Sequence, residues 1–208
     1  MKAENWDSFW HSIQRFKLLD RVTRSVTWRQ YQKFLKEVEK RDLSVLELGC
    51  GFGLNSLKII KEYGGSATLV DYCDYALDNV KKEFQKAGLC ATFLKEDFFD
   101  LHLNSRFTLV HSEGVLEHFY DDERVKAFEI HVKAMAEDGF LFIFVPTNNR
   151  SYRIVQKLFN FFGIRVDEKP FTEDEFVRLV NKYNLEIVDK AKYLLFWRGF
   201  LIRNSPAN

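Results

Sequence analysis

The chain is poor in cysteine and carries no excess of either charge. Its 208 residues include 3 cysteines, and 31 basic residues nearly balance 30 acidic ones, which gives a net charge of +1. Cys50, Cys73 and Cys90 form neither an even disulfide set nor a pair with metal-ligand spacing, so we expect reduced thiols and no metal site. A balanced charge produces no overall field that would favour nucleic acid or a membrane surface.

Long apolar stretches are also missing. No apolar run approaches the roughly 20 residues that span a bilayer, and the first residues of the chain lack the apolar core of a signal peptide. We therefore expect a cytoplasmic protein without a membrane span. What the chain does have is phenylalanine, 21 residues in all, and a length that suits one α/β domain with a substantial core.

Strand-like and helix-like patterns alternate from Ser44 onward. The expected strands are residues 44–48, 67–71, 91–95, 107–112 and 139–145, and the expected helices between them are 54–63, 75–87 and 121–136. Such alternation predicts a mostly parallel sheet with helices on both faces. Right-handed crossovers place the carboxyl ends of its strands at one edge. Gly49, Asp71, Asp97 and Ser112 all follow such ends, which predicts a ligand crevice there.

Three segments lie outside this alternation. Residues 5–41 have helical spacing, in two pieces, and residues 148–170 hold a second helical stretch that Gly163 ends. Thr172 and Glu175 predict a capping box at the start of a later helix. The chain closes with β-like runs at residues 185–188, 193–197 and 199–202, and we expect the hairpin between the last two. No repeat or linker divides the chain, so residues 1–208 are predicted to form a single domain.

The most informative segment is the apolar run Val45–Leu48, which ends in a glycine turn. A dinucleotide-binding fingerprint needs a third glycine where this chain has Leu54, so that pattern fails. The turn instead reads Glu47-x-Gly49-x-Gly51-x-Gly53. It resembles motif I of the class I S-adenosylmethionine-dependent methyltransferases, in particular their small-molecule enzymes, and the resemblance covers about residues 43–202.

The resemblance implies a Rossmann-like, doubly wound α/β fold. Its seven-stranded sheet would be mostly parallel with a C-terminal antiparallel hairpin. Residues 43–147 would form the cofactor-binding core, and residues 171–208 the last helix and strands. Outside the shared core, we expect residues 1–41 to form an N-terminal helical cap and residues 148–170 a helical lid. The implied cofactor is S-adenosylmethionine, with S-adenosylhomocysteine as the product.

The resemblance also implies which residues bind the cofactor. Asp71 would accept hydrogen bonds from both ribose hydroxyls, Tyr72 would lie along the adenine edge, Asp97 would accept from the adenine amino group, and Phe98 would pack on the ring. The full implied set is Glu47, Gly49, Cys50, Gly51, Gly53, Asp71, Tyr72, Asp97, Phe98, Ser112 and Glu113.

Several of these residues have a plainer interpretation. Asp71 alone could cap the helix that follows it, Asp97 could be a turn residue, and Cys50 could be a small residue in a tight turn. Glu47 is either an exposed strand residue or a group that supports the turn or faces the sulfonium. These alternatives stay open at the level of sequence.

Methyl transfer from a sulfonium needs alignment and a dry site, and it needs a base only when the acceptor is protonated. His118 is the candidate base, with a capping or surface role as its alternative, and His111 is a second candidate inside the fourth strand. The segments outside the shared core would select the acceptor, through Trp28, Arg29, Tyr31, Tyr152 and Arg153. An apolar pocket with a few cations favours a small-molecule acceptor.

Other functions compete with a small-molecule methyltransferase. A methyltransferase acting on RNA or protein is possible because the N-terminal segment is basic, although neutral total charge makes nucleic acid an unfavoured partner. A non-catalytic cofactor-binding scaffold that pairs with a catalytic partner would keep the same turn. An NAD-dependent dehydrogenase ranks last because of Leu54.

Overall fold

The computed structural model describes residues 17–38, 42–97, 99–161 and 168–206. The elements of the first half are α2 (Lys17–Val38), β1 (Leu43–Leu48), α3 (Leu54–Tyr63), β2 (Gly65–Asp71), α4 (Asp74–Lys86), β3 (Thr92–Lys95) and β4 (Phe107–Glu113). Those of the second half are the 3₁₀ turn η2 (Leu116–His118), α5 (Asp121–Ala134), β5 (Met135–Pro146), α6 (Arg150–Phe161), α7 (Glu173–Lys182), β6 (Leu185–Tyr193) and β7 (Trp197–Asn204).

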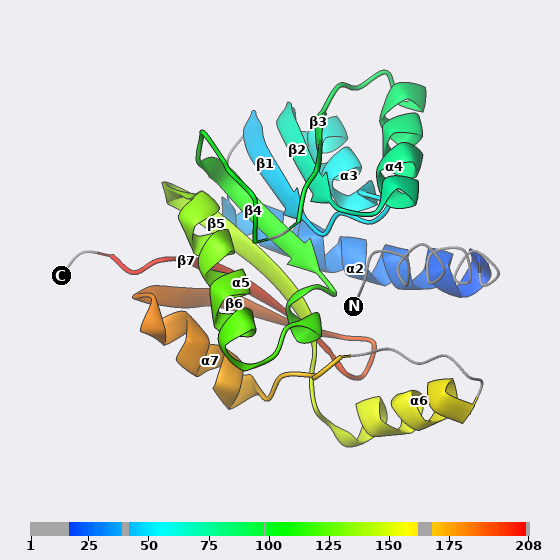
Figure 1. The fold of residues 1–208 in the computed structure, drawn as a ribbon, viewed down its shortest axis with the longest axis vertical. Coiled ribbons are helices and arrows are strands. Elements are labelled where there is room, and N and C mark those ends of the chain that lie inside the picture. The colour runs from blue at the N-terminus through cyan, green and yellow to red at the C-terminus, as the bar shows by residue number, and fades with distance from the viewer. Residues whose placement is uncertain (1–16, 39–41, 98, 162–167, 207–208) are drawn as a thin grey trace.

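All seven strands form one sheet with the order β3-β2-β1-β4-β5-β7-β6 (Figure 1). Strands β1 to β5 are parallel to one another, while β7 runs antiparallel to both β5 and β6. The expected fold, a doubly wound, mostly parallel sheet with a C-terminal antiparallel hairpin, is confirmed. The order changes direction between β1 and β4, and doubly wound sheets bind their ligands at the carboxyl ends of the two strands at such a switch point.

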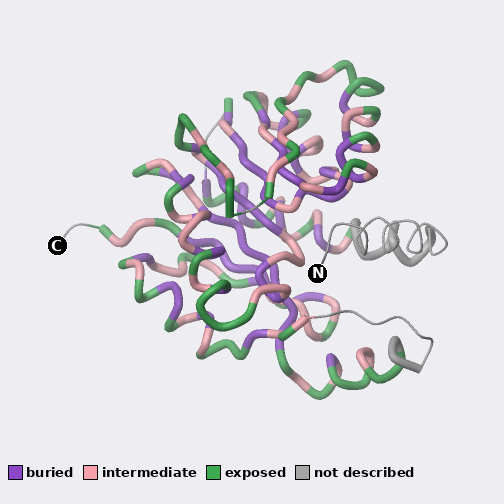
Figure 2. Tube along the Cα trace, viewed as in Figure 1, coloured by how far each residue is buried: buried purple, intermediate pink, exposed green. Residues whose placement is uncertain are grey.

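Helices cover the two faces of the sheet and create two apolar layers. On one face, Tyr31 and Phe34 of α2 join Ile59 of α3 and Val80 of α4. On the other face, buried residues of α5 and α7, such as Phe128 and Phe176, pack against the sheet. The central strands supply residues to both layers, and Figure 2 shows burial concentrated along them. Most of the chain's phenylalanines that fall in described segments therefore fill the core.

The hairpin that ends the sheet lies elsewhere than predicted. The sequence pattern suggested a turn at Arg198, but β6 continues to Tyr193 and the turn comprises residues 194–196. Leu194 and Leu195 take positive φ values of 47° and 63° there. Such values are unusual for leucine. Because these turn residues are apolar and not typical turn formers, the sequence pattern predicted a strand here.

Other boundaries match closely. The capping box is confirmed, since the Thr172 hydroxyl accepts a hydrogen bond from the Glu175 backbone N–H and the Glu175 carboxylate accepts one from the Thr172 backbone N–H. The predicted helix 54–63 corresponds to α3. In the N-terminal segment, α2 runs unbroken from Lys17 to Val38, and residues 1–16 lie outside the described part. Within the described residues, no helix combines the length and apolarity needed to cross a membrane.

Candidate active site

The glycine turn between β1 and α3 is built on left-handed backbone. Gly49, Gly51 and Gly53 have φ values of 65°, 50° and 54°. A Cβ on Gly53 would lie 2.4 Å from atoms of both Leu69 and Val80, so α3 packs against the sheet at a distance that only glycine permits. Glycine at this position therefore determines how closely the helix packs as well as the path of the turn.

Asp71, at the end of β2, is tied to the same turn. One carboxylate oxygen accepts a hydrogen bond from the Gly51 backbone N–H at 2.8 Å, and the other accepts one from the Cys73 N–H at 3.0 Å. The cap of α4 is instead the Cys73 sulfur, which accepts from Ala76, so the capping alternative for Asp71 is wrong. The structure thus joins the turn and the acid into one edge, with Tyr72 half-buried beside them.

Glu47 lies beneath the turn and is buried rather than exposed. Its carboxyl group accepts hydrogen bonds from the side chain and backbone of Ser56, in the first turn of α3. Gly53 offers that helix no side-chain cap, so Glu47 satisfies part of its amino terminus from another strand. Burial, with the nearby charges of Glu113 and Asp71, raises the pKa of Glu47 to about 8.

Cys50 is a buried thiol inside the turn. Its backbone N–H donates to the Val70 carbonyl and its own carbonyl accepts from Gly53, at 3.0 and 2.7 Å. Burial and the neighbouring Asp71 raise the pKa of the thiol. These contacts agree with the plainer interpretation of Cys50, a small residue that fits a tight turn.

The end of β4 is occupied by two residues with different partners. The Ser112 hydroxyl is buried and donates to His131 Nε2 at 2.8 Å, because His131 Nδ1 is satisfied by the Ala127 carbonyl. Glu113 accepts from Thr27 of α2 and Asn55 of α3, each at 3.0 Å. Glu113 therefore anchors α2 beside the carboxyl end of β4, and Ser112 directs its hydroxyl into the core.

The adenine-side residues are less fully described. Asp97 is exposed after β3, where its Oδ1 accepts from the Phe99 N–H at 2.9 Å. That bond fits the turn-residue interpretation and leaves a carboxylate on the surface. Phe98, the predicted ring-packing residue, lies outside the described residues.

The two candidate histidines take different positions. His111 is fully buried in β4, between the Tyr31 hydroxyl and the Ser56 hydroxyl, each 2.9 Å from a ring nitrogen. Desolvation lowers the pKa of His111 to about 3, so the ring stays neutral and has no route to an acceptor. His118 is half-buried on η2, just beyond the end of β4.

The predicted acceptor-side residues on α2 also differ in burial. Trp28 is half-buried and Arg29 exposed on α2, whereas Tyr31 is fully buried and stacks on Phe144 with 4.6 Å between ring centroids. The expectation that Tyr31 reaches a ligand is therefore corrected, because its ring belongs to the core.

The two predicted acceptor-side residues of the lid lie near the start of α6. Arg153 is exposed, and its Nε donates to Asn148 at 3.2 Å. Tyr152 is buried, and its hydroxyl donates to Glu168 at 2.6 Å. Residues 162–167 of the predicted lid lie outside the described part.

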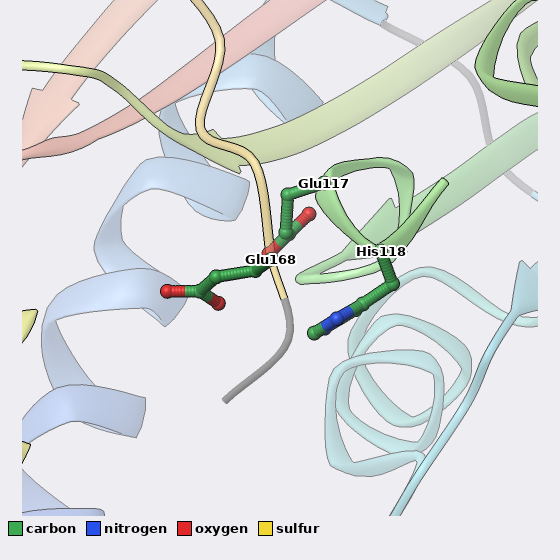
Figure 3. A group of neighbouring side chains, drawn as sticks. All are labelled: Glu117, His118 and Glu168. Carbon is green, nitrogen blue, oxygen red and sulfur yellow. The ribbon is translucent and has the colours of Figure 1, made fainter. Parts of the chain in front are cut away.

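His118 belongs to a cluster of three possible ligand residues that the sequence did not predict. Glu117, His118 and Glu168 each place a ligand-type atom within 4.8 Å of the others (Figure 3). Glu117 is buried, and its Oε2 and the Oε2 of Glu47 are the buried side-chain oxygens that lack a hydrogen-bond partner in the described part of the chain. The adjacent pair Glu117-His118 was a visible signal, but Glu168 is distant in sequence and joins them only through the fold.

The comparisons agree with this geometry. Residues 45–139 match the profile of a family described as methyltransferase domain. No curated protein matches the sequence significantly.

Solved structures of methyltransferases share the fold at low identity. A Burkholderia thailandensis 1,6-didemethyltoxoflavin-N1-methyltransferase, with bound 1,6-didemethyltoxoflavin and S-adenosylhomocysteine, superposes with a TM-score of 0.76 at 19% identity, over 98% of this chain and 87% of its own. An S-adenosylmethionine-dependent methyltransferase from Clostridium acetobutylicum gives 0.71 at 15%, over 96% and 98%. The magnesium protoporphyrin IX methyltransferase of Synechocystis, with bound S-adenosylhomocysteine, gives 0.70 at 15%, over 89% and 83%.

Proposed function

We propose that this chain, whose residues 45–139 match a methyltransferase-domain family model, is a class I S-adenosylmethionine-dependent methyltransferase that transfers a methyl group from that cofactor to a small-molecule acceptor by direct displacement. The observation that carries the proposal is the bond between the Gly51 N–H and Asp71. It joins the glycine turn and the acid at the switch point of the sheet, where doubly wound folds bind their ligands.

The residues at this edge fit the cofactor. Gly49 and Gly51 give the turn its left-handed backbone, and we assign this turn to the methionine part of the cofactor. Asp71 holds its carboxylate at the end of β2, and a carboxylate has further lone pairs for two neighbouring ribose hydroxyls. Asp97 is the proposed acceptor for the adenine amino group. Glu47, Cys50 and Ser112 support the site from below, since their polar atoms face the protein.

The cofactor supplies an activated methyl group, and the protein supplies alignment and exclusion of water. Glu113 contributes to both by fixing α2 at the ligand edge through Thr27. We place His118 on the acceptor side, because it follows the end of β4 and remains partly accessible. His111 is left out, since its neutral ring is enclosed by the core.

A small acceptor is supported by the elements that flank the edge. Trp28 and Arg29 on α2, with Tyr152 and Arg153 near the start of α6, are the proposed contacts. They combine aromatic and cationic groups, a set suited to a small molecule with an acidic or conjugated part. The structural relatives include methyltransferases named for small-molecule substrates, which favours this class over RNA or protein.

Ligand-dependent stability tests the cofactor. Thermal unfolding would be followed with S-adenosylmethionine, S-adenosylhomocysteine and NAD side by side. A ligand at about 100 times its dissociation constant stabilises by roughly 2.7 kcal/mol, so the first two should raise the melting temperature and NAD should not. Asp71→Asn should lose the response, while Asp78→Asn, on the exposed side of α4, should keep it. Stabilisation by NAD alone would overturn the proposal.

Turnover tests the acceptor-side placement of His118. His118→Ala should lower the rate at saturating acceptor and leave S-adenosylhomocysteine affinity unchanged, because the residue lies away from the glycine turn. Unchanged turnover would remove His118 from the reaction.

A further inference from the structure

Two carboxylates and an imidazole converge beside the end of β4. Glu117 and His118 come from η2, and Glu168 comes from the segment that precedes α7 (Figure 3). Their ligand-type atoms lie within 4.8 Å of one another. A set of this kind can surround a cation, but acidic groups also gather on surfaces without one, so the burial and the support of the group decide its meaning.

The burial of the Glu117 side chain is energetically costly. Its side chain is 1% exposed, and its Oε2 has no hydrogen-bond partner in the described part of the chain. A buried carboxylate oxygen without a partner carries a large desolvation cost. The Glu168 carboxylate lies within 4.8 Å of the Glu117 ligand-type atom, and two like charges this close repel each other. A cation between the two carboxylates would remove both the orphaned oxygen and the repulsion.

The frame around the group is rigid. The Lys169 N–H donates to the Glu117 carbonyl at 2.8 Å, which fixes Glu168 beside η2. The buried Arg124 donates to the carbonyls of Phe119 and Lys169 and to the Glu175 carboxylate. Two segments about 50 residues apart are thus joined by the same guanidinium. Preorganisation of this type is what a ligand set requires to hold one geometry.

An outer hydrogen bond orients Glu168. The Tyr152 hydroxyl donates to Glu168 Oε1 at 2.6 Å, and Gln156 donates to that hydroxyl at 3.2 Å. Partners of this kind fix the orientation of metal-binding carboxylates and raise metal affinity. The bond engages one of the two oxygens of Glu168.

We propose that Glu117, His118 and Glu168 bind one divalent first-row transition-metal cation, of the Mn²⁺ or Zn²⁺ kind, which in turn holds an oxygen of the methyl acceptor. Imidazole favours these metals, whereas Mg²⁺ and Ca²⁺ prefer an all-oxygen set. Three protein ligands leave coordination positions open, as in catalytic rather than structural metal sites.

The second half of the proposal rests on the proposed function, and its chemistry balances. A hydroxyl of the acceptor that coordinates the cation has a lowered pKa and releases its proton to solvent. The oxygen lone pair then attacks the methyl carbon of the sulfonium, a C–O bond forms and the C–S bond breaks. The bonding electrons stay on sulfur, which leaves as the neutral thioether. His118 is then a ligand rather than a free base.

Direct metal binding is the decisive experiment. Mn²⁺ would be titrated into the metal-free, full-length protein without cofactor, and free Mn²⁺ would be followed by electron paramagnetic resonance, with Zn²⁺ as competitor and Mg²⁺ as a separate arm. We expect one Mn²⁺ per chain, displaced by Zn²⁺ and not by equimolar Mg²⁺. Glu117→Gln and Glu168→Gln should abolish the site, and Tyr152→Phe should weaken it about 10- to 100-fold.

Glu123→Gln is the matched control, because this exposed carboxylate lies on the neighbouring α5 and outside the cluster. It should bind Mn²⁺ as the parent does. Absence of stoichiometric binding, retention of binding in Glu117→Gln, or an equal loss in Glu123→Gln would each overturn the metal site.

S-adenosylhomocysteine binding, measured by calorimetry on the same samples, keeps the two proposals separate. It should persist in Glu117→Gln and Glu168→Gln, which also establishes that these variants are folded. A chain that binds S-adenosylhomocysteine but not Mn²⁺ overturns the metal site alone. A chain that binds Mn²⁺ but neither S-adenosylmethionine nor S-adenosylhomocysteine overturns the proposed function alone. Full turnover in the presence of a chelator would overturn the role of the metal in holding the acceptor.

Discussion

Single residues at the ligand edge serve the fold and the site together. Gly53 allows α3 to approach β2, Asp71 holds the Gly51 N–H, and Glu47 satisfies the start of α3. The glycine pattern could be recognised from sequence because left-handed turns demand glycine. The partners of Glu47 and Ser112 could not, because a side chain on a strand does not reveal which helix it will meet.

Gly53→Ala should be strongly destabilising, because an added Cβ meets Leu69 and Val80 and the residue keeps a positive φ. Left-handed backbone and overpacking together cost roughly 2–5 kcal/mol. Gly88→Ala is the control, since it also has a positive φ but nothing within 4 Å of an added Cβ, and it should cost about 1–2 kcal/mol. Urea denaturation measures both. Equal losses would mean that close packing at Gly53 is unimportant.

Glu47 should make stability fall as the pH rises from about 4.5 to about 8. Its pKa is raised from 4.5 in the ordinary state to about 8 in the fold, so the native state keeps a proton that the unfolded chain has released. Stability from this group is complete below about pH 4.5 and is lost as the pH rises through 8, by about 1.4 kcal/mol for each pH unit between these values.

Glu47→Gln isolates this contribution. The groups that face Glu47, namely Ser56, His111, Glu113 and Asp71, are common to both proteins. The stability of the variant relative to the parent should therefore increase with pH between 5 and 8 and level off above 8. Urea unfolding at a series of pH values gives this difference. Parallel stability curves would contradict a buried, protonated Glu47.

At the scale of elements, Arg124 of α5 connects the parts around the candidate metal group. Its guanidinium lies 4.0 Å from the Phe171 ring centroid and bonds to η2, to the segment before α7 and to α7 itself. Sequence periodicity predicted α5 and α7 as separate helices. It could not predict this connection, since a buried arginine on an amphipathic helix looks like a surface cation.

Arg124→Gln should loosen the segment at Lys169 before the whole protein unfolds. The Lys169 N–H, bonded to the Glu117 carbonyl, should exchange with solvent about 10- to 100-fold faster, because hydrogen bonds to charged groups contribute roughly 1.5–3 kcal/mol. Arg178→Gln, at an exposed position on α7, should leave that exchange unchanged. Hydrogen–deuterium exchange resolved at Lys169 measures the effect, and equal rates in both variants would contradict it.

At the scale of the whole molecule, α2, the first described helix, contacts strands from the second half of the chain. Tyr31 lies against Phe144 of β5 and bonds to His111 of β4, and Lys33 pairs with Asp189 of β6 at 2.6 Å. Through Thr27 the same helix reaches Glu113 at the ligand edge. The helix α2 is therefore integral to the core on this face of the sheet.

Tyr31→Phe should destabilise the protein by about 1–3 kcal/mol, because it keeps the ring but leaves a buried His111 nitrogen without its hydroxyl partner. Tyr183→Phe is the control, since its hydroxyl makes only long contacts of 3.4 and 3.5 Å at a partly exposed position, and it should change stability by less than about 0.5 kcal/mol. Thermal denaturation compares the two. An equal effect would mean that the Tyr31–His111 bond does not hold α2.

The sequence by itself determined the parallel sheet, the glycine turn and the acids that follow its strands, because backbone dihedrals and periodicity are local properties. It also placed His118 beyond the fourth strand. Only the tertiary structure decided that Tyr31 is core, that the last hairpin turns at residues 194–196, and that Glu168 meets Glu117 and His118. Those outcomes depend on contacts between distant segments, which no local pattern records.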